Sequence, residues 1–200
     1  GGLPADARTL QLGDAAPDFT LLGIDGKTHT LADYKAAKLL MVVFLSNHCP
    51  YSHAAETRLI PLAKEFKAQG LDVVSINPNS PDSVRVDELG YSKYNDGYAE
   101  MKLYARDSGF PFPYLYDGDT QAAAKAYGCL ATPHVFLFDQ GFEPGQLGLA
   151  PVGVEAVEEA ADHVVGLARA AMPGAELQAF EAGVVHAGAL ADAGGKINRT

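Results

Sequence analysis

The chain has 200 residues, of which 48% are hydrophobic, and this is enough to bury the core of one α/β domain with additions. Its formal net charge of −10 argues against nucleic acid or an anionic membrane surface as a partner. No run of about eighteen apolar residues occurs, so we expect no membrane-spanning helix. Two cysteines are too few for the disulfide framework of a small secreted domain.

The first elements predicted along the chain are a β-hairpin and a buried strand. Residues 17–22 and 28–31 read as two strands joined by the Asp25-Gly26 turn. Residues 38–45 form a continuous apolar run, which is typical of a central strand buried on both faces. The N-terminal part of the chain therefore predicts a hairpin that leads into the middle of a sheet.

The next segments predict a strand, a helix and a second strand that pair in parallel. Residues 50–69 have helical apolar spacing, with Gly70 as the stop, and residues 71–77 form the following strand. A strand–helix–strand unit implies a right-handed crossover. Residues 78–95 are too irregular to assign.

The second half of the chain alternates helical and extended segments. The pattern predicts helices over 96–108, 119–127 and 154–172, an extended segment over 111–117, and a strand over 134–139. Asp119 or Thr120 is expected to cap the second of these helices. Residues 140–153 give only a weak strand signal.

Cys49 is the strongest candidate for a functional residue. It stands where the buried strand gives way to the helix, so its sulfur faces the free N–H groups at the positive end of the helix dipole, which favour the thiolate. His48 is adjacent to it, and His53 lies one turn further along. A thiolate reacts with both peroxides and disulfides. The structural alternative is an inert, buried cysteine.

Four segments carry a resemblance to a known family. They are 13–19 (GDAAPDF), 44–51 (FLSNHCPY), 110–117 (FPFPYLYD), and 126–128 together with 132–134 (AYG and TPH). They resemble the AhpC/TSA (peroxiredoxin-like, redoxin) family, in particular a subgroup with the motif C-N-H-C-P. The resemblance covers about residues 11–139 and is weaker afterwards, where the family has a further edge strand.

The resemblance implies a thioredoxin-like three-layer sandwich, in which helices flank a central mixed sheet behind an N-terminal β-hairpin. We expect this domain to occupy residues 1–175, with 176–200 as a partly mobile C-terminal extension. The segment after Gln140 either replaces the edge strand or builds a homodimer contact. The chain starts at Gly1 and favours neither the cytoplasm nor an exported location, periplasmic or secreted.

Three positions depart from the family's patterns. Ser46 stands where the thioredoxin-like members have a first cysteine, so no dithiol exists at 46 and 49, although Ser46 fits the peroxiredoxin pattern Thr/Ser-x-x-Cys. Val42 occupies the place of a peroxiredoxin proline, and Thr132-Pro133 stands where those enzymes place an arginine. The resemblance also implies that Pro133 is cis and lies opposite Cys49. The chain therefore combines features of the thioredoxin-like members with features of the peroxiredoxins.

The resemblance and the residues together predict a thiol-based oxidoreductase. Its substrate is a small peroxide, or a protein or small-molecule disulfide, and an external thiol regenerates it; no cofactor and no metal are expected. The catalytic residues are expected to be Cys49 and Ser46, with substrate positioning by His48, Pro50, Thr132 and Pro133.

Three alternatives remain open from the sequence. A two-cysteine peroxidase would use Cys129 as the resolving thiol, although this residue lies two positions before the family's usual place and buried structural cysteines are common. A non-catalytic thioredoxin-like module would bind a partner protein, or a metal ion through Cys49 and the histidines at 48, 53 and 134. Ser46 could also be an engineered replacement for a cysteine.

Overall fold

The computed structural model describes residues 10, 14–81, 93–129, 132–139 and 148–149. The predicted helix over 154–172 and the extension over 176–200 lie outside the described residues. The strands are β1 (Thr20–Gly23), β2 (Thr28–Thr30), β3 (Leu39–Phe44), β4 (Leu71–Asn77), β5 (Tyr114–Tyr116), β6 (His134–Asp139) and β7 (Gly148–Leu149). The helices are α1 (Pro50–Phe66), α2 (Tyr98–Ser108) and α3 (Ala122–Tyr127), with 3-10 turns η1 (Leu31–Tyr34) and η2 (Lys67–Gln69).

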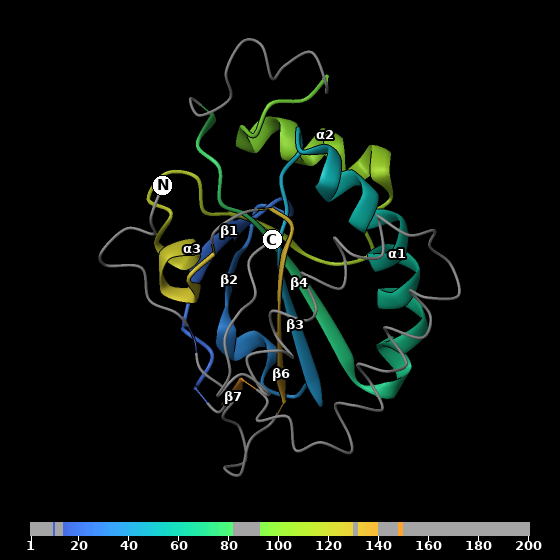
Figure 1. Cartoon of the computed structure of the whole chain (residues 1–200), viewed down its shortest axis with the longest axis vertical. Helices are drawn as coiled ribbons and strands as arrows, with labels where there is room; N and C mark the ends of the chain where they lie inside the picture. The colour runs from blue at the N-terminus through green and yellow to red at the C-terminus, as the bar shows by residue number, and fades with distance from the viewer. Residues whose placement is uncertain (1–9, 11–13, 82–92, 130–131, 140–147, 150–200) are drawn as a thin grey trace, which may run out of the picture.

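The strands form one mixed sheet in the order β2-β1-β5-β4-β3-β6-β7. The three central strands β5, β4 and β3 are parallel, whereas the flanking pairs β1–β2, β1–β5, β3–β6 and β6–β7 are antiparallel. Helices α1 and α2 cover one face and α3 the other, which gives three layers (Figure 1). The predicted three-layer α/β sandwich with an N-terminal hairpin is confirmed.

Strand β3 is buried on both faces, as its continuous apolar sequence predicts. Leu40, Val42 and Phe44 pack into a core cluster that contains residues of α3, whereas Met41 and Val43 pack into a second cluster with residues of α1 and α2. Successive side chains of a strand point to opposite faces, so this one strand links both cores. The sheet is therefore a rigid base for the loop that follows Phe44.

The short strand β7 lies within residues 140–153, where the sequence gives only a weak strand signal. Gly148 and Leu149 pair antiparallel with Asp139 and Phe138, and β7 is the edge strand on this side of the described sheet. In the described part of the chain, no helix is both long and apolar enough to cross a membrane.

Helix α3 begins at Ala122, later than predicted, and the side chains of Asp117 and Thr120 accept its first N–H groups. The carboxylate of Asp117 accepts the backbone N–H groups of Ala123 and Ala124 at 3.1 and 2.8 Å, while Thr120 Oγ1 accepts that of Ala122 at 3.2 Å. Of the two predicted caps, Thr120 accepts one of these N–H groups and Asp119 accepts none of them, because the other two face the buried Asp117 at the end of β5.

Candidate functional site

The loop from Ser46 to Cys49 lies at the carboxyl end of β3, in the middle of the sheet. The backbone N–H of Leu45 still donates to Ile76 of β4 at 2.9 Å, so the loop starts from the last paired residue of a central strand. Helix α1 then begins at Pro50, where the lack of an N–H costs no hydrogen bond in a first turn. This strand-to-helix junction fixes the positions of the four loop residues.

Cys49 is the N-cap residue of α1 and is half-buried. Its Sγ–H donates to the carbonyl oxygen of Thr132 at 3.2 Å, and its backbone N–H donates to Ser46 Oγ at 3.2 Å. The Thr132–Pro133 peptide bond is cis, as predicted. Cys49, Thr132 and Pro133 therefore meet, although 83 residues separate Cys49 from Thr132 along the chain.

Ser46 is completely buried and bonds within the loop and its supports. Besides the N–H of Cys49, its Oγ lies 3.0 Å from His48 Nδ1 and 3.5 Å from Asp96 Oδ2, and its own N–H donates to Ser52 Oγ at 3.2 Å. Ser46 thus contacts the backbone of Cys49 and holds the loop closed against the first turn of α1.

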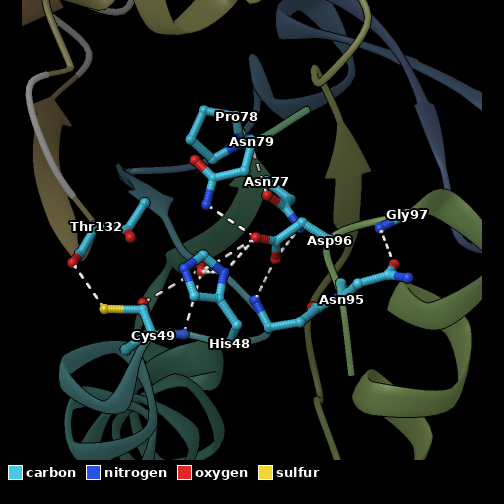
Figure 2. A network of polar contacts seen from close by, with 12 residues as sticks. His48, Cys49, Asn77, Pro78, Asn79, Asn95, Asp96, Gly97 and Thr132 are labelled. Atoms are coloured by element: carbon cyan, nitrogen blue, oxygen red, sulfur yellow. Dashed lines mark hydrogen bonds and ion pairs between the residues drawn. The ribbon is translucent and has the colours of Figure 1, made fainter. Parts of the chain in front are cut away.

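Asp96 is the centre of the polar network and was not identified from the sequence. It is completely buried, two residues before α2, and its Oδ1 accepts the backbone N–H of Asn47 at 2.7 Å and Asn77 Nδ2 at 3.0 Å. Its Oδ2 accepts Asn79 Nδ2 at 3.0 Å and lies 2.5 Å from His48 Nδ1 (Figure 2). A buried carboxylate needs such donors, because burial without them costs several kcal/mol.

Asn47 connects the loop to three further parts of the fold. Its Nδ2 donates to the carbonyl of Asn95 at 2.8 Å, and its Oδ1 accepts the hydroxyl of Tyr114 at 2.9 Å. The carbonyl of Asn47 accepts His53 Nε2–H at 2.7 Å. His53 therefore bonds to the backbone of the loop.

The remaining predicted residues lie in different surroundings. Pro50 is exposed at the start of α1, while Cys129 packs against the core cluster on the α3 face of the sheet. Both cysteines are among the described residues, and neither forms a disulfide. Within the described ranges, no group of three or more His, Cys, Asp or Glu residues is arranged to hold a metal ion. The metal-binding alternative gains no support from these residues.

A central mixed sheet, a cysteine at the start of the helix that follows β3, and a facing cis-proline together define a thioredoxin-like protein. The chain belongs to the AhpC/TSA family, which residues 12–142 match. This assignment agrees with the resemblance seen in the sequence.

Curated relatives of this chain have two kinds of name. "Thiol-disulfide oxidoreductase ResA" from Geobacillus thermodenitrificans is 26% identical over 129 residues, which are 64% of this chain and 64% of that protein. "Putative peroxiredoxin Rv2521" from Mycobacterium tuberculosis is 28% identical over 118 residues, 58% of this chain and 64% of that protein. The chain thus spans slightly less than two thirds of each of these relatives.

Solved structures agree with the fold. A hypothetical protein from Sinorhizobium meliloti 1021 is 34% identical, with a TM-score of 0.59 over 70% of this chain and 69% of that one. The thioredoxin domain of a thiol-disulfide oxidoreductase from Bacteroides vulgatus is 17% identical, with a TM-score of 0.53 over 70% of this chain and 86% of that one. At this lower identity the similarity shows the fold alone.

Proposed function

We propose that this protein is a thiol-dependent oxidoreductase in which Cys49 is the single reacting cysteine. The thiolate of Cys49 attacks one oxygen of a small peroxide, or one sulfur of a disulfide. The products are a sulfenic acid and an alcohol or water in the first case, or a mixed disulfide and a thiol in the second. An external thiol then reduces Cys49 and completes the cycle.

The position of Cys49 is the observation that carries this proposal. Its sulfur lies at the N-terminus of a 17-residue helix, where unpaired N–H groups favour a negative charge. It is half-buried, so an electrophile has access to it, and it faces the Thr132 carbonyl beside Pro133. An inert structural cysteine is expected instead within an apolar core.

The surroundings of the two cysteines favour a one-cysteine cycle. The residue three positions before Cys49 is Ser46, so no second thiol is present there. Hydrogen bonds hold its hydroxyl in place. Cys129 packs with the apolar cluster on the α3 face, and its N–H donates to the carbonyl oxygen of Ala124 within α3 at 2.8 Å. The names of the two curated relatives support disulfide exchange and peroxide reduction as the alternative reactions.

The experiment is to treat the reduced protein with hydrogen peroxide, and separately with a small disulfide, and to identify the products by mass spectrometry. We expect one added oxygen, or one mixed disulfide, at Cys49, reversed by a thiol. Cys129→Ser should leave the product unchanged, and Cys49→Ser should abolish it. An internal Cys49–Cys129 disulfide would replace this mechanism with the two-cysteine cycle, and no reaction with either reagent would reject the enzymatic function.

A further inference from the structure

The sulfur of Cys49 faces a hydrogen-bond acceptor that belongs to the backbone. The thiol donates to the carbonyl oxygen of Thr132, with Sγ 3.2 Å from this oxygen. A carbonyl oxygen accepts hydrogen bonds and has no hydrogen of its own to give. The contact therefore stabilises those forms of the side chain that carry a hydrogen at or next to the sulfur.

The product of a reaction with peroxide is one of these forms. A sulfenic acid carries its hydrogen on the oxygen bonded to sulfur, and a hydroxyl is a better donor than a thiol. The S–O–H group is bent at its oxygen, so the hydroxyl reaches the carbonyl of Thr132 while the sulfur keeps its place. The backbone N–H of Cys49 donates to Ser46 Oγ at 3.2 Å, and oxidation of the sulfur leaves this bond intact.

A sulfenic acid has two routes by which it reacts within its own chain. It condenses with a thiol to a disulfide, or with a backbone nitrogen to a sulfenamide. Neither described cysteine is in a disulfide, and Cys129 packs against the apolar cluster on the α3 face of the sheet. Position 46, one helical turn before Cys49, is a serine. The arrangement thus offers no thiol beside the sulfur for the first route.

The residue after Cys49 closes the second route. A sulfenamide forms when the sulfur bonds to the nitrogen of the next residue, and the hydroxyl leaves as water together with the hydrogen of that N–H. The next residue is Pro50, the first residue of α1, whose nitrogen carries no hydrogen. Water therefore cannot be lost between the sulfenic acid and this peptide nitrogen.

We propose that Cys49, Pro50 and Thr132 form a site that retains the sulfenic acid of Cys49. The carbonyl of Thr132 accepts the hydrogen bond of its hydroxyl, and Pro50 prevents its dehydration to a sulfenamide. The sulfenic acid then persists until a thiol from outside the chain reduces it. This inference rests on the proposed function and specifies the fate of its peroxide product.

The cycle balances with a hydroperoxide as the oxidant and a thiol as the reductant. The Cys49 sulfur bonds to one peroxide oxygen and gives up two electrons, the O–O bond breaks, and the departing oxygen takes a proton from water to form an alcohol. The external thiol then attacks the sulfur of the sulfenic acid, so an S–S bond forms and the hydroxyl leaves as water. A second thiol releases the first as a disulfide and restores the thiol of Cys49.

The first test follows the lifetime of the sulfenic acid by mass spectrometry. The reduced protein receives an equimolar amount of hydrogen peroxide, catalase removes the remainder, and dimedone is added after increasing delays. The wild type should keep its added oxygen and its dimedone labelling at Cys49. Pro50→Ala supplies an N–H next to the sulfur, so it should lose water and, with it, the labelling. Pro61→Ala removes an exposed proline from the same helix and should behave as the wild type.

The second test observes the carbonyl of Thr132 directly by NMR. Thr132–Pro133 is the single Thr-Pro pair in the sequence, so threonine labelled with carbon-13 at the carbonyl and proline labelled with nitrogen-15 give one assigned resonance. Cys49→Ala removes the donor and should shift this resonance. The sulfenic acid should instead keep it near its position in the reduced wild type, because the carbonyl still accepts a hydrogen bond.

The possible results separate the retention of the sulfenic acid from the function on which it rests. If the oxidised wild type loses its label to a sulfenamide or to a Cys49–Cys129 disulfide, retention is wrong, although Cys49 still reacts. Equal lifetimes in Pro50→Ala and the wild type would overturn the role of Pro50, and a Thr132 resonance at its Cys49→Ala position would overturn that of Thr132. If Cys49 forms only a mixed disulfide with a small disulfide, the function stands without this inference; if it reacts with neither reagent, both are wrong.

Discussion

The buried carboxyl group of Glu56 predicts how the stability of this protein depends on pH. Glu56 lies in α1 and is 5% exposed. Its Oε2 accepts the hydroxyl of Tyr104 at 2.5 Å, whereas Oε1 is buried without a hydrogen-bond partner among the described residues. Burial raises the pKa of Glu56 from 4.5 to about 7, and the hydrogen bond from Tyr104 opposes this rise only in part.

The magnitude follows from the difference between the folded and unfolded pKa values. The folded protein holds the Glu56 proton up to about pH 7, while the unfolded chain releases it near its ordinary pKa of 4.5. Between these values the folded state binds more protons, so the free energy of unfolding falls as the pH rises. At about 1.4 kcal/mol per pKa unit, Glu56 costs the folded state about 3 kcal/mol once the pH exceeds 7.

The assay is urea unfolding followed by circular dichroism at several pH values from about 4.5 to about 8, a window chosen from the shifted pKa. In Glu56→Gln the side chain no longer titrates. Its free energy of unfolding, relative to the wild type, should therefore rise by about 3 kcal/mol across this window. Glu65→Gln, an exposed position on the same helix, is the control and should run parallel to the wild type. Parallel curves for Glu56→Gln and the wild type would refute the reasoning.

Three further predictions concern the cysteines and the cap of α3. Ser46→Cys should place two thiols at the start of α1, and mild oxidation should then join the new thiol to Cys49 in a reversible disulfide, which thiol counting before and after reduction would detect. Cys129→Ala should lower the free energy of unfolding by about 1 kcal/mol and leave the rate of Cys49 alkylation unchanged; a lower rate would instead link Cys129 to the site. Asp117→Ala should cost about 1 to 2 kcal/mol in urea unfolding, because two buried N–H groups lose their acceptor; an unchanged midpoint would contradict this capping role.

The elements that the sequence predicted well are those with a strong local pattern. Strand β3 follows from its apolar run alone, and α1 follows from helical spacing between Pro50 and Gly70. The place of Cys49, the thiol that we propose to react, was also predictable, because a cysteine at the junction of two such elements has a defined position. Local patterns are sufficient where neighbouring residues in the chain determine the environment.

Asp96 shows why the rest of the site was not predictable. Its partners Ser46, Asn47 and His48 lie 48 to 50 residues earlier, and the irregular segment 78–95 separates it from β4. Read locally, an acidic residue before a helix suggests a cap, and the sequence indeed placed Asp96 at the start of a helix. Only the pairing of β3 with β4 and the packing of α2 bring its carboxylate under the Cys49 loop. No spacing rule contains that information.

The network also explains how a single thiol can be kept in a defined geometry. Ser46, Asn47 and His48 each bond to Asp96, and Ser46 Oγ accepts the N–H of Cys49. The conformation of the loop therefore depends on oxygen and nitrogen partners, none of which is consumed when Cys49 is oxidised. Sulfur is a weak hydrogen-bond acceptor, so a thiol at position 46 would support the loop less well than the hydroxyl. On this reasoning, the hydroxyl of Ser46 supplies the hydrogen bonds that hold the loop, and with it the Cys49 thiol, in place beside Thr132.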